Sequence, residues 1–129
     1  MLIHDFLDYY ARDTPDAPCV TQEGDTFSYG ELLSRSNQLA AALLESGLEK
    51  GQRIAILGEN SVEHVVVMMA ASKIGAVAVP LNYRLAPAEL AFIINDAKVR
   101  VLLVLDNLAD TLALLRDHLP SDITLLSQA

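Results

Sequence analysis

Residues 73–85 read KIGAVAVPLNYRL, and this stretch decides how the rest of the chain is interpreted. Gly75 is followed by the apolar run AVAV at 76–79, which predicts a buried strand of a parallel sheet. Pro80 is expected to break that strand, because proline cannot donate a ladder hydrogen bond. The residues after the break carry an amide, a phenol and a guanidinium: Asn82, Tyr83 and Arg84.

Strands and helices are expected to alternate on both sides of this stretch. RIAILG at 53–58 and VRVLLVL at 99–105 are typical of buried strands, and ITLL at 123–126 predicts a last short one. Helices are predicted for the segments between them: 62–74, 87–96 and 106–119. This alternation is typical of an α/β fold with a parallel sheet and helices on both faces.

The N-terminal part is predicted to hold two helices and a hairpin. Apolar residues recur at helical spacing in the first dozen positions. CVTQ and DTFS flank a glycine turn and predict the hairpin. Ser28 and Glu31 have the spacing of a capping box, and Gly47 is expected to end the helix that they start. Asn60 is expected to cap the following helix, with Glu63 in its first turn.

Length and composition fit one soluble cytoplasmic domain, and residues 1–129 are expected to form a single α/β piece. Nine basic against seventeen acidic residues give a net charge of −8, which argues against a nucleic-acid partner. Cys19 is the only cysteine, as expected in a reducing compartment. The start MLIHDFLDYY lacks the basic region of a signal peptide, and no apolar run reaches the roughly 20 residues of a membrane span.

Ligands of open parallel sheets bind beyond the carboxyl ends of the strands. None of those places in this sequence carries GxGxxG or GxxxxGK[ST], and the six glycines stand singly. The histidines and the cysteine are interpreted as packed or surface residues: His4, His64, His118 and Cys19. Asp106 is interpreted as a helix cap, although a response-regulator receiver keeps its phosphate acceptor at such a strand end. No catalytic residue and no metal site is expected.

Arg84 is the one candidate for binding a ligand. A guanidinium at the carboxyl end of a strand suits phosphate, because its fork of donors matches the oxygens. Two structural alternatives to the ligand role stay open. In the first, Arg84 forms a salt bridge, for example with Glu89 on the next helix. In the second, Asn82 simply shapes the turn.

The sequence resembles the adenylate-forming (AMP-binding) enzymes, which include acyl-CoA synthetases, luciferases and peptide-synthetase adenylation domains. FSYGEL at 27–32 is similar to their first core motif and AASKIGAVAVPLN at 70–82 to their second. The surrounding segments agree in order and spacing: ARDTPDAP, LEKGQRIAILGENS and LNYRLAPAEL. An asparagine at 82, with an arginine two positions on, resembles the CoA ligases more than the peptide-synthetase domains, which usually have aspartate there. Ala86 departs from the usual serine or threonine.

The resemblance implies that this chain is the N-terminal part of an acyl-CoA synthetase that stops before the nucleotide site. The parent is expected to activate a fatty or aromatic acid with ATP and Mg²⁺ and to pass the acyl group to CoA. Arg84 is implied to lie near the CoA nucleotide. The chain alone is expected to be inactive and to bind none of these ligands tightly.

Two other interpretations remain open. The first is a stand-alone small α/β module that binds a nucleotide or CoA, and the second is a regulatory domain of receiver-like fold.

The apolar middle of VEHVVVMMAASKI at 62–74 also predicts that the chain self-associates as a homodimer, because an apolar patch on a monomer rarely stays exposed to water.

Overall fold

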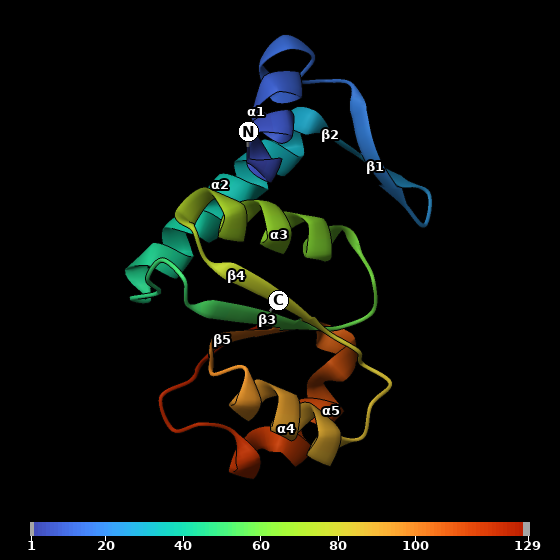
Figure 1. Cartoon of the computed structure of the whole chain (residues 1–129). Coiled ribbons are helices and arrows are strands. Elements are labelled where there is room, and N and C mark those ends of the chain that lie inside the picture. Colours follow the sequence, from blue (N-terminus) through green and yellow to red (C-terminus); the bar gives the residue numbers. More distant parts are fainter. Residues whose placement is uncertain (1, 128–129) are drawn as a thin grey trace. The chain divides into compact units, whose positions relative to one another are not determined.

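The computed structural model describes residues 2–127, apart from the side chain of Asp106. The chain divides into two compact units (Figure 1). The first unit comprises residues up to 49 together with residues 60–75. The second comprises residues 50–59 and the chain from residue 76 onward. None of the helices within residues 2–127 has the length and apolar character that a membrane span requires.

The first unit has the helices and the hairpin that the sequence predicts. In chain order its elements are α1 (Ile3–Asp13), β1 (Pro18–Gln22), β2 (Asp25–Ser28), α2 (Tyr29–Glu45) and α3 (Val62–Ile74). Strands β1 and β2 pair antiparallel through a turn in which Glu23 and Gly24 both have positive φ. The Ser28 hydroxyl accepts a hydrogen bond of 3.1 Å from the backbone N–H of Glu31, which confirms one half of the predicted capping box.

The start of α3 differs from the expectation that Asn60 caps it. Ser61 is the N-cap residue, and its side chain makes no capping hydrogen bond. The backbone N–H of Val62 instead donates to the side-chain oxygen of Gln22 over 2.7 Å. An acceptor from the hairpin therefore supplies what a local cap would supply, so the prediction for Asn60 is wrong.

Helix α3 is also less exposed than expected. Leu7, Leu32, Val62 and Val66 form a buried cluster in this unit. Among the apolar residues of α3, Met68 alone is exposed, at 45%. The homodimer that the sequence predicts stays a prediction.

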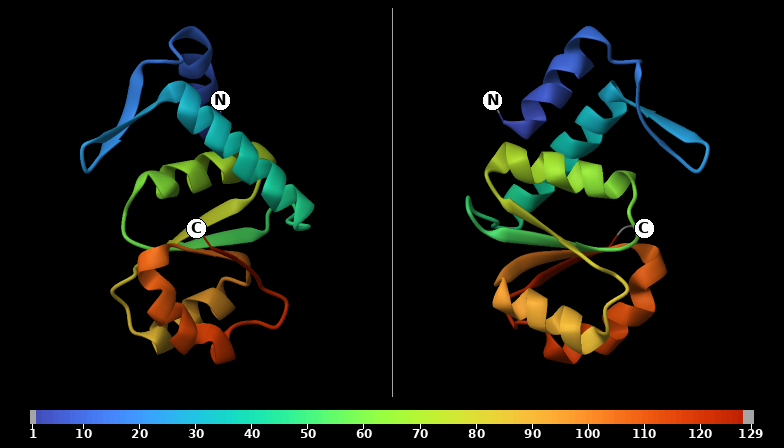
Figure 2. Two further views of the ribbon diagram at one scale, coloured as in Figure 1. Left: turned by 180° about the vertical axis from the view of Figure 1, so that it is seen from behind. Right: turned by 45° about the vertical axis from the view of Figure 1, so that its right-hand side comes forward.

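The second unit is a parallel sheet flanked by helices, as the α/β pattern predicts. Its strands are β3 (Arg53–Leu57), β4 (Val77–Leu81), β5 (Val99–Val104) and β6 (Thr124–Ser127), in the order β4-β3-β5-β6. Its helices are α4 (Pro87–Asp96) and α5 (Ala109–Leu115) (Figure 2). All three strand pairs are parallel.

Pro80 does not break its strand. Strand β4 continues through Pro80 to Leu81, with Pro80 opposite Ile56 of β3. β4 pairs with β3 alone and lies at the edge of the sheet. An edge strand tolerates proline because the missing N–H would face away from the only partner strand. The expected break is therefore wrong, and the turn begins at Asn82.

The segment 106–119 is helical in three pieces rather than in one. A 3₁₀ turn, Asp106–Leu108, precedes α5, and a second, Arg116–His118, follows it. Leu108 occupies the N-cap position of α5. Asp106 is therefore not the N-cap residue of α5 but the first residue of the preceding turn. Its side chain lies outside what the structure describes.

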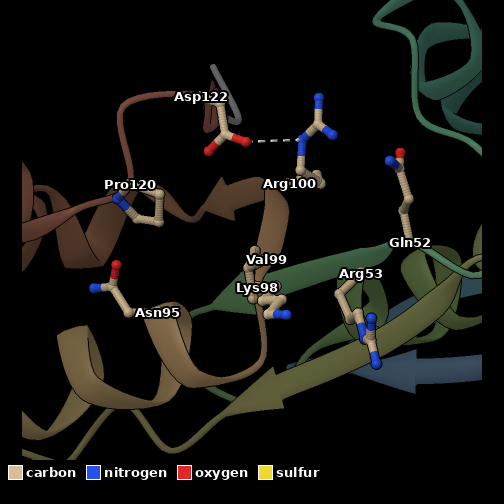
Figure 3. A pocket seen from close by; sticks show the side chains of 8 residues that line it. All are labelled: Gln52, Arg53, Asn95, Lys98, Val99, Arg100, Pro120 and Asp122. Atoms are coloured by element: carbon tan, nitrogen blue, oxygen red, sulfur yellow. Dashed lines mark ion pairs between the residues drawn. The ribbon is translucent and has the colours of Figure 1, made fainter.

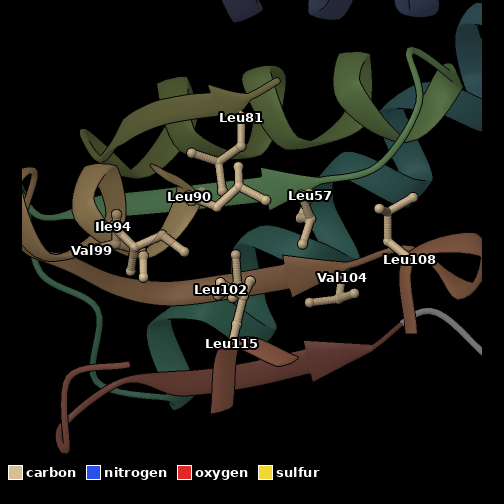
Figure 4. Packing of buried hydrophobic residues seen from close by; sticks show 11 residues of the cluster. Leu57, Leu81, Leu90, Ile94, Val99, Leu102, Val104, Leu108 and Leu115 are labelled. Atoms are coloured by element: carbon tan, nitrogen blue, oxygen red, sulfur yellow. The ribbon is translucent and has the colours of Figure 1, made fainter. Parts of the chain in front are cut away.

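The core of the second unit lies between the sheet and the helices α4 and α5 (Figure 4). Leu57, Leu102 and Leu115 are among its fully buried members. Alternate residues of the strands face this core, since successive side chains of a strand point to opposite faces. Leu90 and Ile94 of α4 enter it from the helix side, one turn apart.

Gly58 and Leu105 pack closely where β3 and β5 end. The backbone N–H of Leu105 donates to the carbonyl of Leu57 over 3.0 Å. A Cβ atom on Gly58 would lie 2.9 Å from the Cβ of Leu105 and would also overlap the Cγ and Cδ1 atoms of that side chain. Glycine is therefore required at position 58 for these two strand ends to approach.

Gly58→Ala is expected to lower the free energy of unfolding by about 1–3 kcal/mol, because an added methyl group overpacks the contact with Leu105. Urea unfolding followed by circular dichroism measures the change. In a Leu105→Ala background the same substitution is expected to cost less, since two of the crowding atoms are gone. Strictly additive effects of the two substitutions would contradict the close packing.

Candidate functional site

The turn after β4 presents the polar residues that the sequence singles out. The side-chain oxygen of Asn82 accepts a hydrogen bond of 3.0 Å from the backbone N–H of Arg84. The carbonyl oxygen of Asn82 accepts a second one, of 3.1 Å, from the N–H of Leu85. Asparagine is suited to this place because its side chain can imitate a backbone acceptor two residues on. The alternative that Asn82 shapes the turn is therefore confirmed.

The turn places its side chains alternately toward the core and toward water. Tyr83 and Leu85 are partly buried and pack against the core of the second unit. Asn82 and Arg84 lie between and beside them and are exposed. The anchoring of Tyr83 and Leu85 fixes the backbone of the turn, so the direction in which Arg84 leaves it is fixed as well.

The side chain of Arg84 rests on its neighbour. Its Nε–H donates to the hydroxyl of Tyr83 over 3.2 Å, and its guanidinium carbon lies 5.5 Å from the centre of the Tyr83 ring. No ion pair between Arg84 and Glu89 exists among the described residues. The salt-bridge alternative therefore has no support, and the terminal nitrogens of Arg84 are free to meet an anion.

The ends of the other strands offer fewer candidate side chains for binding a ligand. Gly58 is closed off by Leu105, as described above. Asn107 is exposed, and the side chain of Asp106 is outside the described part. Within residues 2–127, Arg84 is thus the basic side chain that lies within three positions of the carboxyl end of a strand of this sheet.

His64 and Cys19 of the first unit have structural surroundings. Burial lowers the pKa of His64, while the neighbouring Glu63 opposes that shift. The Nδ1 atom of His64 lies 3.3 Å from the hydroxyl of Ser61. Burial raises the pKa of the Cys19 thiol, and a hydrogen bond with Tyr29 opposes it. A thiol with a raised pKa is a poor nucleophile, which agrees with the packed cysteine expected from the sequence.

One group of potential metal ligands lies on α1, where the sequence predicts no metal site. Suitable atoms of His4, Asp5 and Asp8 lie within 4.8 Å of one another. Each already has a protein partner: His4 lies 2.8 Å from the Ser72 hydroxyl, Asp5 accepts from the N–H of Leu2, and Asp8 pairs with Lys73. The spacing i, i+1, i+4 in the sequence would have identified the group, but its existing partners give it a structural role.

Comparison with known proteins identifies the family. The model of the AMP-binding enzyme family matches residues 7–128 of this chain. The chain belongs to the AMP-binding enzymes. This membership confirms the family that the motifs at 27–32 and 70–82 indicate.

The names of similar proteins indicate different products and different acceptors of the acyl group. Surfactin synthase subunit 2 of Bacillus subtilis (strain 168) is 40% identical over 104 residues, which are 81% of this chain and 3% of that protein. The fatty acid–[acyl-carrier-protein] ligase ScoC of Streptomyces coeruleorubidus is 32% identical over 121 residues, which are 94% of this chain and 23% of that protein. The solved structure of Mycobacterium tuberculosis fatty acyl CoA synthetase is 30% identical, with a TM-score of 0.90, and the match covers 98% of this chain and 26% of that one.

The AMP-binding chain described here spans about a quarter or less of the length of these three relatives. Its fold is that of the N-terminal part of AMP-binding enzymes of known structure. What the relatives activate, and what accepts the product, is known for them and becomes a proposal for this protein.

As the pH falls, the free energy of unfolding of the chain is expected to decrease, and protonation of His64 accounts for part of this decrease. Because its pKa is lower in the folded than in the unfolded state, the unfolded chain takes up the proton first as the pH falls below about 6.5. The free energy of unfolding then decreases until the pH reaches the pKa of His64 in the folded state. His64→Gln should therefore reduce the dependence of the unfolding free energy on pH in this range. Urea unfolding between pH 8 and pH 5 measures it, with His118→Gln, at an exposed histidine, as the control. Equal flattening in both variants would contradict the assignment.

Proposed function

We propose that this chain is the N-terminal part of a cytoplasmic AMP-forming acid–CoA ligase that acts on a fatty or aromatic acid. The observation that carries the proposal is the exposed Arg84, held in a turn that Asn82 closes, in a member of the AMP-binding enzymes. Relatives named as fatty acyl and 3-hydroxybenzoate CoA ligases support the two classes of acid.

The proposed reaction has two steps. The carboxylate of the acid attacks the α-phosphorus of ATP, which forms an acyl adenylate and releases pyrophosphate. The thiol of CoA then attacks the acyl carbon, forms the thioester and releases AMP. Mg²⁺ would screen the charge of the ATP phosphates. Residues 2–127 contain no glycine-rich loop that could wrap the ATP phosphates, and the possible metal ligands on α1 already have protein partners, so we assign both to the rest of the full-length protein.

Arg84 is proposed to contact a phosphate of the CoA nucleotide. Its guanidinium is exposed, is steadied by the Tyr83 ring and hydroxyl, and keeps its terminal nitrogens available. A planar fork of N–H donors is the arrangement that recognises phosphate oxygens best. Because the turn is closed by Asn82, little further ordering is needed when the phosphate binds.

A second candidate is an adenylating enzyme that hands its acyl group to a carrier protein. The identity of 40% to a surfactin synthase subunit and the relative named as an acyl-carrier-protein ligase favour it. The asparagine at position 82, where peptide-synthetase domains usually have aspartate, favours CoA. Release of AMP by the full-length protein with acid, ATP and either CoA or a phosphopantetheinylated carrier protein distinguishes the two acceptors.

Arg84→Ala in the full-length protein is expected to raise the KM for CoA roughly tenfold or more, because the loss of one charge-assisted hydrogen bond costs about 1.5–3 kcal/mol. ATP–pyrophosphate exchange, which reports the first step alone, should stay nearly unchanged. Steady-state kinetics of thioester formation and the exchange assay measure the two effects.

Two controls accompany this experiment. Arg116→Ala removes another exposed arginine of the second unit and should change neither step. The 129-residue chain alone is expected to show no exchange above a heat-treated sample. If the KM values for acid and ATP rise as much as that for CoA, Arg84 has a structural role and the proposed contact is wrong.

A further inference from the structure

A basic hollow lies at the amino-terminal edge of the sheet in the second unit (Figure 3). Its volume is about 400 Å³. Arg53 starts β3, Lys98 directly precedes β5, and Arg100 is the second residue of β5. Pro120 and Asp122, from the loop before β6, contribute another part of the lining.

The register of the sheet brings these basic residues together. Arg53 is paired with Val99, so Lys98 and Arg100 flank the residue that lies opposite Arg53. In Figure 3, the side chain of Arg100 extends toward the top of the view beside Asp122, and the side chains of Arg53 and Lys98 extend toward the bottom. The residues 53 and 98–100 are far apart in the sequence and line one hollow only because β3 and β5 are neighbours.

The charge of the hollow is opposite to that of the chain. The chain has nine basic and seventeen acidic residues and a net charge of −8. Three of the nine basic residues line this hollow, against one of the seventeen acidic ones, so the hollow has a net charge of +2. A local positive charge of this size in an acidic protein favours an anion at this place.

The donors of the hollow are incompletely used. Arg53 and Lys98 take part in no ion pair within the described part of the chain. The Nε atom of Arg100 lies 3.6 Å from a carboxylate oxygen of Asp122, too far for a good hydrogen bond. That Nε–H is shielded from solvent and has no hydrogen-bond partner among the described residues. A buried donor without an acceptor is costly and is rare in native proteins.

The end of α4 places Lys98 in the hollow. Lys98 follows the C-cap residue Ala97 and has a φ of 55°, the left-handed conformation in which many helices end. The neighbouring wall is braced by Asn95, whose side-chain amide donates to the carbonyls of Ala91 and His118 over 2.8 and 2.9 Å. Asn95 supports the hollow and is not counted among the donors for a ligand.

We propose that this hollow binds the phosphate group of a small molecule. A phosphate dianion matches the net charge of +2, and the guanidinium groups of Arg53 on one side of the hollow and of Arg100 on the other each offer the forked donors that phosphate oxygens accept. Lys98 adds a compact positive charge. Asp122 competes with the ligand for Arg100 and limits the affinity. The site lies at the opposite edge of the sheet from Arg84 and does not depend on the proposed ligase activity.

The test is a titration of the 129-residue chain with inorganic phosphate, followed by two-dimensional ¹⁵N–¹H NMR. Sodium chloride at equal ionic strength is the reference for non-specific screening. We expect saturable shifts that are confined to residues 52–53, 98–100 and 120–122. Shifts that do not saturate, that occur equally with chloride, or that lie elsewhere would overturn the proposal.

Three variants test which charged residues of the hollow favour phosphate binding and which one opposes it. Arg53→Gln and Lys98→Asn are each expected to weaken phosphate binding about tenfold, and asparagine tolerates the left-handed backbone at position 98. Asp122→Asn is expected to strengthen binding, because it removes the competing charge beside Arg100. Arg116→Gln, at an exposed arginine outside the hollow, should leave the affinity unchanged. Equal affinity in all four variants would overturn the proposal.

Discussion

The parallel pairing of β3 with a strand on each side is the constraint on which the second unit depends. Leu57 at the end of β3 lies opposite Leu81 of β4 and Val104 of β5, so three strands end at the same edge. The contact of Gly58 with Leu105 extends this alignment beyond the ladder. Parallel strands need crossover connections, and α4, which connects β4 to β5 on the other side of β3, packs onto the sheet and provides part of the core.

The carboxyl edge and the amino edge of the sheet carry different side chains. In a parallel sheet the strands end at one of these edges and start at the other. At the carboxyl edge, the turn closed by Asn82 holds Arg84 outward, and this geometry is what the proposed contact with CoA requires. At the amino edge, the starts of β3 and β5 bring Arg53, Lys98 and Arg100 to one hollow. The role of the first edge is a proposal within the AMP-binding family, and that of the second rests on charge and geometry alone.

Local sequence patterns predict the strands well because each apolar run is short and bounded by turn residues. The features that the patterns miss depend on long-range structure. Whether Pro80 breaks a strand depends on strand order, since only an edge strand can accommodate it. The N–H of Val62 is satisfied by Gln22, which lies 40 positions earlier, so a local search for a cap at Asn60 fails. The basic hollow is invisible in the sequence for the same reason, whereas Asn82 and Arg84 are found because their turn is local.

The account of the carboxyl edge rests on Arg84 meeting a phosphate of CoA, and one comparison tests it most directly. Thioester formation by the full-length protein and its Arg84→Ala variant is measured with CoA and with pantetheine, which keeps the thiol arm and lacks the nucleotide phosphates. The account predicts that the variant loses roughly tenfold or more in kcat/KM with CoA and is unchanged with pantetheine. An equal loss with both thiols would show that Arg84 acts on the structure or on the first step, and would contradict the account.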